Sequence, residues 1–320
     1  MTILITGYAG FIGSALCRKL IAGGERVIGV DSHNSVLYSS RLKNSNTNEL
    51  IKFGPLFSSY IFDLSDIDCE FFKKHQVRSV INFAALPGQV SSWQRFDQYL
   101  KSNVFATQRL LEAIKCYGKV DKLIQVSTSS VYGAFANSKE SSLLTPSSPY
   151  GVTKLAAENL IKCYCDILDV DYTILRYFSV YGPGQRPDMA ISQFLKRIIS
   201  NKSILATGDG TQARDLSYVD DVVAATISAL KIETPQTVYD ISGGESFTVN
   251  EIVNTCLKVT NSKLNVEYIE RPIGDQEKTL GNRESAVQDL GLKRTVSLEE
   301  GVSNQFQHLL RKIKELGDYS

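Results

Sequence analysis

The chain has 320 residues, 43% of them apolar, and its 35 basic and 34 acidic residues leave a formal net charge of +1. This length is enough to bury a full hydrophobic core, in one large domain or two unequal ones. Because no basic block stands out, the charge pattern argues against nucleic acid or a membrane as a partner. Residues 1–10 run straight into a strand and a glycine turn without a charged or long apolar leader, so we expect a cytoplasmic protein.

The six cysteines and three histidines are scattered along the chain, without a Cys-x-x-Cys pair or a metal-ligand spacing. We therefore expect reduced thiols that pack as small apolar groups, and no metal site. Cys163 and Cys165 lie two apart on a predicted helix, so their side chains should point to different sides.

Short apolar strands alternate with longer amphipathic helices over the first two thirds of the chain. The predicted strands are 3–6, 26–30, 79–85, 122–127 and 171–178, and the predicted helices are 13–23, 103–118 and 151–168. This alternation predicts an α/β protein with a doubly wound parallel sheet of the Rossmann type, covered by helices on both faces. Its ligands should bind beyond the carboxyl ends of the strands. Residues 32–60 are polar and rich in Ser and Asn, so we expect a long loop there.

The alternation becomes irregular after Phe178, where loops such as 182–187, 207–215 and 270–279 separate shorter elements. We expect a smaller α/β substrate-binding lobe that is interleaved with the last sheet elements. The predicted division gives residues 1–178 plus about 218–245 to the nucleotide-binding domain, and residues 179–217 plus 246–320 to the smaller lobe.

A glycine pattern follows the first strand. Gly7, Gly10 and Gly13 would allow a tight turn, a close backbone approach to a pyrophosphate, and close packing of helix on strand, respectively. Phe11 and Ile12 belong to the first turn of the helix, whose N–H groups would face the anion. Asp31 ends the second strand, 18 residues after Gly13, where a carboxylate can accept hydrogen bonds from both adenosine ribose hydroxyls. An acid there repels a 2′-phosphate, so the sequence favours NAD over NADP as cofactor.

A tyrosine and a lysine share one face of a later helix. Ser148 can cap this helix and Pro149 fits its first turn, which places Tyr150 and Lys154 four residues apart. A free phenol has a pKa of about 10, but an ammonium about 6 Å away contributes roughly 3 kcal/mol in favour of the phenolate. The positive nicotinamide ring would add to this effect, which makes Tyr150 a candidate general base.

These motifs resemble the extended short-chain dehydrogenase/reductases, which share the G-x-x-G-x-x-G spacing and the Tyr-x-x-x-Lys pair. The resemblance implies adenine contacts at Asp63 and Leu64, and cofactor contacts at Ala84, Ala85, Tyr150 and Lys154. It also implies that Thr128, in the polar strand end 126–133, hydrogen-bonds the reacting oxygen.

The same strand end separates the branches of that superfamily. Sugar-nucleotide 4,6-dehydratases carry Thr-Asp-Glu here and UDP-glucuronate decarboxylases usually carry Thr-Ser-Glu, whereas this chain reads Thr128-Ser129-Ser130. The acid used for eliminating water is absent. What remains is oxidation to a 4-keto sugar followed by re-reduction, which is the reaction of a nucleotide-sugar 4-epimerase.

Two loops of the smaller lobe resemble the nucleotide-sugar contacts of these epimerases. By this resemblance Arg214 and Arg271 pair with the diphosphate, since a guanidinium matches phosphate oxygens well, and Asp275 accepts from the ribose hydroxyls. UDP is the usual nucleotide of this branch, although the sequence leaves another base open.

The choice of sugar depends on the segment 176–190. Epimerases for neutral hexoses typically read Arg-Tyr-Phe-Asn at the strand end, but this chain has Ser179 at the asparagine position, followed by a loop with Arg186. This resembles UDP-glucuronate 4-epimerases, in which a hydroxyl residue and this arginine bind the sugar carboxylate, with Ser127 or Thr128 as further candidates. The alternative is that Arg186 pairs with Asp188 or a phosphate.

The resemblance also assigns substrate contacts to Pro87 and Ser129. Beside them the family more often reads Gly-Val-Arg-x-Ser, and residues 88–92 lack that arginine. The expected activity is NAD-dependent interconversion of UDP-glucuronate and UDP-galacturonate. The alternatives are a UDP-glucose or UDP-N-acetylglucosamine 4-epimerase and, in another class, a non-catalytic NAD-binding sensor, which would generally lack the Tyr/Lys pair. The resemblance further implies a homodimer joined through helices near 94–117 and 150–168.

Overall fold

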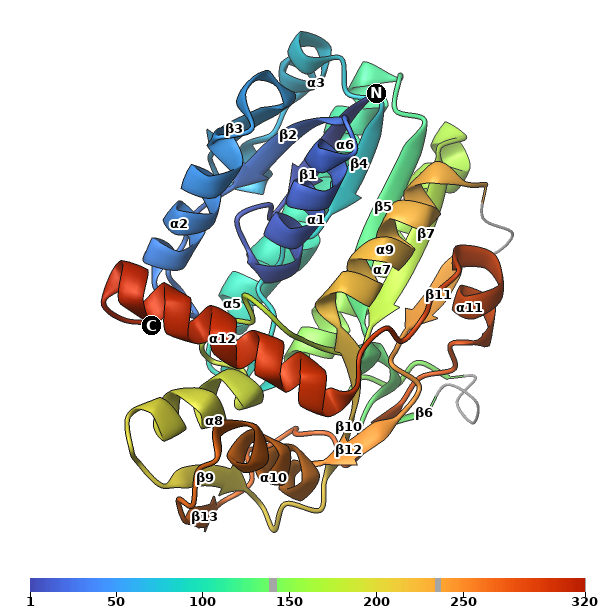
Figure 1. Cartoon of the computed structure of the whole chain (residues 1–320). Helices are drawn as coiled ribbons and strands as arrows, with labels where there is room; N and C mark the ends of the chain where they lie inside the picture. The colour runs from blue at the N-terminus through green and yellow to red at the C-terminus, as the bar shows by residue number, and fades with distance from the viewer. Residues whose placement is uncertain (138–142, 234–236, 320) are drawn as a thin grey trace.

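The computed structural model describes residues 1–137, 143–233 and 237–319. Its centre is a seven-stranded sheet in the order β11-β7-β5-β4-β1-β2-β3, in which every neighbouring pair is parallel (Figure 1). The strand order reverses between β1 and β4, so the predicted Rossmann-type sheet is confirmed. The strands are β1 Thr2–Thr6, β2 Arg26–Asp31, β3 Phe57–Ile61, β4 Ser79–Asn82, β5 Lys122–Thr128, β7 Asp171–Tyr177 and β11 Val238–Ile241.

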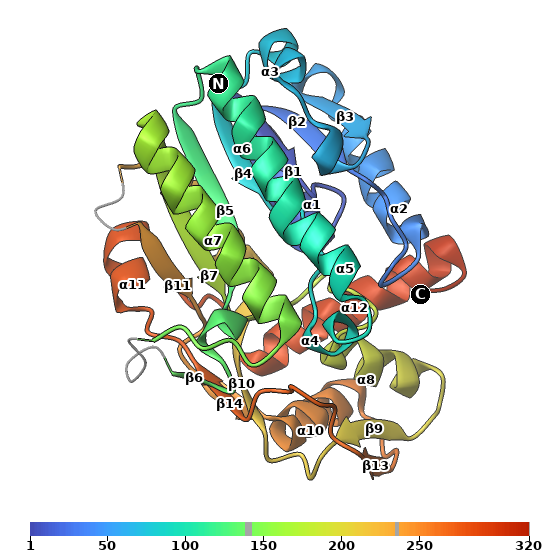
Figure 2. The same cartoon turned by 180° about the vertical axis from the view of Figure 1, so that it is seen from behind.

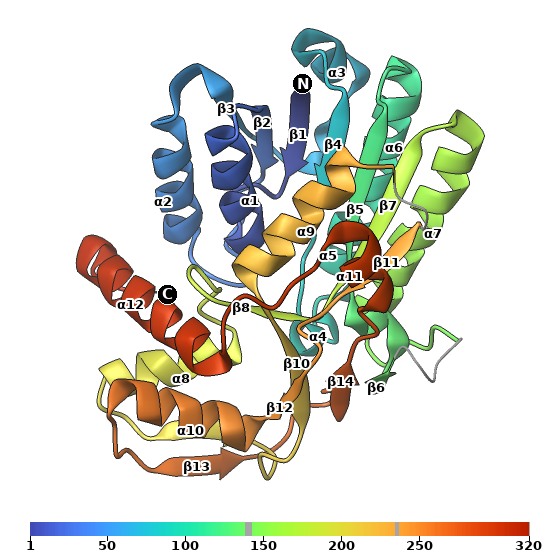
Figure 3. The same cartoon turned by 45° about the vertical axis from the view of Figure 1, so that its right-hand side comes forward.

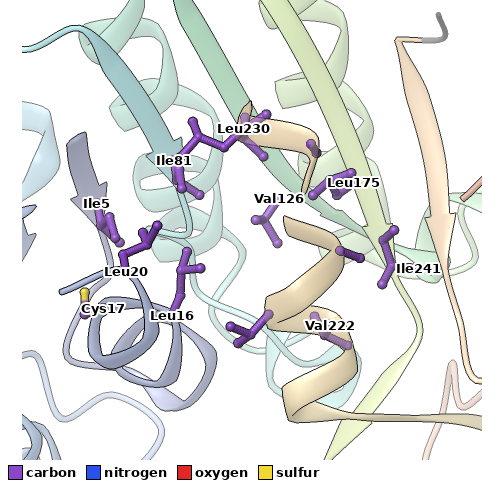
Figure 4. Packing of buried hydrophobic residues seen from close by; sticks show 14 of the residues in the cluster. Ile5, Leu16, Cys17, Leu20, Ile81, Val126, Leu175, Val222, Leu230 and Ile241 are labelled. Atoms are coloured by element: carbon purple, nitrogen blue, oxygen red, sulfur yellow. The ribbon is translucent and has the colours of Figure 1, made fainter. Parts of the chain in front are cut away.

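Helices cover both faces of this sheet, which explains why its strands are almost wholly apolar. One face carries α1 (Phe11–Ala22), α9 (Val219–Lys231) and α11 (Glu284–Leu290), and Figure 4 shows Leu16 and Leu20 of α1 packed toward the strand residues and α9. The other face carries α3 (Cys69–His75), α6 (Ala106–Tyr117) and α7 (Pro149–Leu168), which are seen from behind in Figure 2.

The smaller lobe lies below the carboxyl ends of the sheet strands (Figure 3). Its main sheet has the order β12-β10-β14-β6 with β8 also paired to β10, and a separate parallel pair joins β9 to β13. Three helices cover these strands. The elements are β6 Phe135–Asn137, β8 Ser179–Tyr181, β9 Ile204–Thr207, β10 Ala213–Tyr218, β12 Ser246–Thr248, β13 Val266–Ile269, β14 Lys278–Leu280, α8 Ala190–Ile199, α10 Val249–Thr260 and α12 Leu298–Leu316.

The prediction of a long loop over residues 32–60 is wrong. The segment contains α2 (Ser40–Ile51), a 3-10 turn (Gly54–Leu56) and the edge strand β3. Leu42 and Leu50 of α2 are buried, and the capping side chain of Ser39 accepts from the Arg41 N–H. Packing of these few apolar side chains against the fold outweighs the low helix propensity of the Ser/Asn-rich sequence.

The first residues of the helix predicted for 103–118 belong to a π-helical segment, and the α-helix begins only at Ala106. After the short helices α4 (Gln89–Ser92) and α5 (Phe96–Tyr99), the chain forms a π-helical segment, Leu100–Phe105, and only then α6. Such wide turns often mark functional sites, and this one precedes the helix that packs beside α7. In the described part of the chain, no helix combines the length and apolarity needed to cross a membrane.

Candidate active site

The turn between β1 and α1 has the geometry of a phosphate-binding loop. Gly7 adopts φ +70°, and a Cβ there would lie 2.9 Å from the Ala84 nitrogen. A Cβ on Gly13 would lie 2.4 Å from the Gly7 oxygen, so neither position accepts a side chain. Gly10 caps α1 without a side chain, which leaves the first-turn backbone of Phe11 and Ile12 open to an anion.

Asp31 lies at the carboxyl end of β2, as predicted, and is buried. One carboxylate oxygen accepts from the His33 N–H at 2.8 Å and lies 3.4 Å from the Lys43 ammonium. Sequence reasoning missed Lys43 because it assigned no helix to this segment. The lysine pairs with Asp31 through this oxygen, which gives the buried carboxylate a cationic partner.

The other residues expected at the cofactor lie at the same edge of the sheet. Ala84 follows β4 and donates its N–H to the Thr6 hydroxyl at 3.2 Å, with Ala85 next in sequence. Asp63 begins a 3-10 turn, Leu64–Asp66, where its carboxylate accepts from the backbone and hydroxyl of Ser65. The glycine turn, Asp31 and these loops therefore fit an adenine dinucleotide. When bound at this edge of the sheet, NAD would supply the group that accepts and donates a hydride.

Tyr150 lies in the first turn of α7, as the sequence predicts, because the Ser148 hydroxyl accepts from the Gly151 N–H and Pro149 occupies the first helical position. The phenol is buried, and Tyr99 packs edge-to-face against it at 6.1 Å between ring centroids. Burial raises the pKa of Tyr150, while a hydrogen bond with Thr128 and the charge of Arg186 lower it.

Lys154 is buried one helical turn after Tyr150, and its ammonium has a backbone partner. Its ammonium donates to the Val126 carbonyl at 2.7 Å, and burial lowers the Lys154 pKa to about 8, against the raising effect of Glu158. Within the described chain, Arg186 is the cation whose charge lowers the pKa of Tyr150. Arg186 comes from the loop before α8, so this electrostatic link joins the two parts of the molecule.

Arg186 and Asp188 form a bidentate ion pair, with Nε–Oδ1 and Nη2–Oδ2 distances of 2.9 and 2.7 Å. The sequence leaves this pairing open as the alternative interpretation of Arg186. The same guanidinium also lowers the pKa of Tyr38 and Tyr99, whose pKa values burial raises, so its field extends over the aromatic side chains around the site. Ser179 starts β8, is partly buried, and makes no hydrogen bond to Arg186 among the described residues.

The three residues expected at the nucleotide diphosphate and ribose lie together. Arg214 on β10 pairs with Asp275 at 2.5 Å, and Arg271 lies 3.5 Å from the same carboxylate and 2.6 Å from Glu277. Two guanidinium groups therefore meet one carboxylate at the rim of the lobe. A diphosphate could replace part of this pairing.

Ser127, a further candidate for the sugar carboxylate, contacts a buried acid. Its hydroxyl donates to Glu158 at 2.5 Å, beneath the sheet end. Glu158 is fully buried and also accepts two hydrogen bonds from Arg176, at 3.0 and 2.7 Å. Because the Ser127 proton is already donated, this side chain can only accept a further hydrogen bond.

The remaining predicted residues lie beside Thr128 and Tyr99. Ser129 follows Thr128 directly and begins a 3-10 turn, Ser129–Tyr132, in which it is buried. The Pro87 carbonyl accepts from the Tyr99 hydroxyl at 2.9 Å. The described residues contain no group of three His, Cys, Asp or Glu side chains that could hold a metal.

Sequence reasoning missed several groups that border the site. Glu158 lies four residues after Lys154 on the same helix face, so a search for spaced charges on α7 would have found it. Gln89 and Gln276 hydrogen-bond each other across 187 positions of sequence, and no local pattern signals that contact.

Comparisons with known proteins agree with this geometry. The model of the NAD dependent epimerase/dehydratase family matches residues 3–242. The UDP-glucuronate 4-epimerase of Thermodesulfobacterium geofontis is 36% identical over 322 residues, which cover 97% of this chain and 98% of the relative.

Two solved structures are similar over almost the whole chain. The UDP-glucuronic acid 4-epimerase from Bacillus cereus, in complex with UDP-glucuronic acid and NAD, has a TM-score of 0.90 and 35% identity, covering 99% of this chain and 100% of that one. The UDP-glucose 4-epimerase of Thermotoga maritima, with UDP-glucose, has a TM-score of 0.87 and 31% identity, covering 98% and 100%. On its glycine turn, its Tyr-x-x-x-Lys helix and these matches, the chain belongs to the NAD-dependent epimerase/dehydratase family.

Proposed function

We propose that this protein interconverts UDP-glucuronate and UDP-galacturonate by NAD-dependent epimerisation at C4. The observation that carries the choice of sugar is a largely buried cation, Arg186, whose side chain is 14% exposed and whose charge lowers the pKa of Tyr150. A sugar whose C4 hydroxyl meets the phenol has its C6 carboxylate two carbons away, within the reach of a cation placed near that phenol. The similarity to UDP-glucuronate 4-epimerases supports the same choice.

Tyr150 takes the proton of the C4 hydroxyl when the substrate is oxidised, and returns it when the keto group is reduced. Thr128 holds the reacting oxygen, and Lys154 stays anchored to the Val126 carbonyl. Bound at the glycine turn and Asp31, NAD would supply the acceptor for the C4 hydride and the donor that returns it to the other face of the 4-keto sugar, so no cofactor would be consumed. Arg214, Arg271 and Asp275 hold the nucleotide while the sugar turns over.

The oxidised substrate is a β-keto acid, which loses CO₂ when the C5–C6 bond stands perpendicular to the ketone plane. Arg186, with Ser179 and Thr128, would hold the carboxylate away from that orientation. A charge-assisted hydrogen bond of about 1.5–3 kcal/mol corresponds to roughly a 10- to 150-fold preference for a substrate bearing the anion. Asp188 competes for the guanidinium, so substrate binding exchanges one carboxylate for another.

A neutral-sugar 4-epimerase is the second candidate, because the Arg186–Asp188 pair already neutralises the arginine and a UDP-glucose 4-epimerase is 31% identical. Incubating the purified protein with UDP-glucuronate, and separately with UDP-glucose and UDP-N-acetylglucosamine, distinguishes the two. We expect UDP-galacturonate from the first substrate and little conversion of the others. A UDP-pentose would instead indicate decarboxylation, and preferred turnover of UDP-glucose would overturn the proposal.

The proposed role of Tyr150 is tested by Tyr150→Phe, which removes the titrating hydroxyl and keeps the ring that packs on Tyr99. We expect turnover to fall by about 10²–10⁴-fold, the usual range for a general acid–base group, while UDP-sugar binding persists. Measuring both turnover and calorimetric binding separates chemistry from recognition. Turnover near that of the unsubstituted enzyme would refute the role.

We also propose that the protein is a homodimer with the domain division expected from the sequence, except that α11 packs on the main sheet and β6 joins the sheet of the smaller lobe. Leu100 and Phe105 lie five apart in the π-helical segment, so they share a face, and they are 46% and 50% exposed. Val152 on the adjoining α7 is equally exposed, at 50%. A second copy would cover this apolar face. The six free cysteines fit the reducing conditions of the cytoplasm.

A further inference from the structure

Gln89 joins the catalytic strand end to the nucleotide-binding loop. Its Nε2 lies 3.0 Å from the Ser130 hydroxyl and 3.1 Å from Oε1 of Gln276. The Ser130 hydroxyl is 3.2 Å from that of Thr128, and Gln276 directly follows Asp275. The Gln89 side chain therefore lies between the groups expected at C4 and those expected at the nucleotide.

The direction of the Gln89 amide is set by a backbone group. Gln276 is buried, and its Nε2 donates to the Gly133 carbonyl at 2.7 Å, which directs its Oε1 toward Gln89. Gln89 must then present its NH₂ group to that oxygen. Both amide hydrogens of Gln89 are used, one on Gln276 and one on Ser130, so the only remaining capacity of this side chain is to accept.

The accepting atom, Oε1 of Gln89, is buried and receives no hydrogen bond from the described residues. Leaving a buried amide oxygen without a donor is costly, and native proteins usually satisfy such atoms. The oxygen cannot be turned toward Gln276 or Ser130 without breaking the network that fixes it. A hydroxyl of a molecule bound between the two parts of the site would supply this donor.

We propose that Gln89 is a sugar-specificity residue whose Oε1 accepts a hydrogen bond from a ring hydroxyl, at C2 or C3, of the bound UDP-hexose. This inference rests on the proposed function, since it requires a UDP-hexose in the site. The amide oxygen accepts but cannot donate, so it favours a hydroxyl and disfavours the carboxylate. Arg186 instead favours the carboxylate over a hydroxyl. Together, Gln89 and Arg186 orient the hexose.

The experiment measures binding rather than turnover. In the Tyr150→Phe holoenzyme, calorimetry gives the dissociation constants of UDP-glucuronate and its 2-deoxy and 3-deoxy analogues, with Gln89 present or replaced as Gln89→Leu. We expect one analogue to bind about 10-fold more weakly than the parent when Gln89 is present, because the analogue leaves the buried oxygen unpaired. In Gln89→Leu the parent and that analogue should bind within about 2-fold of each other.

Gln89→Asn repeats the test with a shorter amide, in case leucine disturbs the fold, and should also lose the discrimination. Gln288→Leu, at an exposed glutamine of α11, is the matched control and should retain it. A uniform loss of affinity for all three ligands would show that Gln89 only supports the fold, and equal binding of the three ligands with Gln89 present would equally overturn the proposal. If the unsubstituted enzyme fails to epimerise UDP-glucuronate while the discrimination is found, the proposed function fails and the Gln89 contact stands.

Discussion

Arg186 forms an ion pair with its near neighbour Asp188. Its charge also lowers the pKa of Tyr150, which is distant in sequence. The guanidinium side chain is only 14% exposed, so its charge is weakly screened. Two consequences follow from its removal: a carboxylate-bearing sugar loses its cation, and the pKa of Tyr150 rises further.

Arg186→Ala should therefore lower kcat/KM for UDP-glucuronate by roughly 10- to 150-fold, the range of one charge-assisted hydrogen bond. Because the base must lose its proton, the acidic limb of the pH–rate profile should also move to higher pH. Initial rates over a pH series measure both effects. Lys202→Ala removes an exposed charge from the same lobe and should change neither. Unchanged turnover of UDP-glucuronate in Arg186→Ala would contradict the assignment.

Glu158 should control the charge of Lys154. Burial lowers the Lys154 pKa to about 8 and Glu158 raises it, so Glu158→Gln should lower the pKa further. The ammonium then loses its proton at lower pH, and we expect the alkaline limb of the profile of kcat to move downward in pH. Arg176 would lose its partner in this variant, so thermal unfolding is measured in parallel.

Asp166→Asn, at an exposed acid of the same helix, is the control for Glu158→Gln and should leave the profile in place. An alkaline limb that stays fixed in a folded Glu158→Gln variant would show that Glu158 is structural only.

Single residues differ in how well the sequence predicts them. Thr128 and the glycine turn could be placed because each belongs to a local pattern that follows a strand, and Tyr150 because it follows a helix-start signal, Ser148 and Pro149. The effect of Arg186 on Tyr150 could not be predicted, because Arg186 comes from another part of the chain. The hydrogen bond of Lys154 to the Val126 carbonyl also has no local signal in the sequence. The assignment of each residue to cofactor or substrate remains a prediction.

Helix α7 is the element on which the chemistry depends, since its first turn carries Tyr150 and its second Lys154. Ser148→Ala removes the cap that accepts from the Gly151 N–H, and should cost about 1 kcal/mol of unfolding free energy, within a range of about 0.5–2. Urea unfolding measures this loss. We also expect turnover to fall, because fraying of the first turn moves the phenol.

Ser147→Ala is the matched control, because it changes the neighbouring serine and keeps the cap. If Ser148→Ala were as stable as Ser147→Ala, the cap would contribute nothing to α7.

The sequence predicts those helices and strands whose hydrophobic periodicity is strong. The apolar strands β1, β4, β5 and β7, and the amphipathic helices α1, α6 and α7, follow the pattern expected of a two-sided sheet. Helix α2 was missed because its apolar contacts are few, and β3 because an edge strand needs only one apolar face. The pairing of β14 with β6, which joins residues 278–280 to 135–137, depends on tertiary packing alone.

For the whole molecule, the exposed apolar face on the π-helical segment predicts how two copies meet. Replacing Leu100 and Phe105 together by glutamate puts two charges on that face, and should convert a dimer into a monomer of 35.4 kDa. Sedimentation velocity measures the change. Val287→Glu, on the exposed side of α11, should leave the dimer intact. A monomeric unsubstituted protein would contradict the proposed assembly.

The strand order of the two sheets determines which fragments of the chain can fold by themselves. Strand β11, from residues 238–241, completes the edge beside β7, and β6 supplies a strand to the sheet that holds Arg214 (Figure 3). A fragment ending at residue 178 would lack β11 and α9, and the complementary fragment would lack β6. Neither fragment should fold when expressed by itself, whereas co-expression of both could restore the complete structure by complementation.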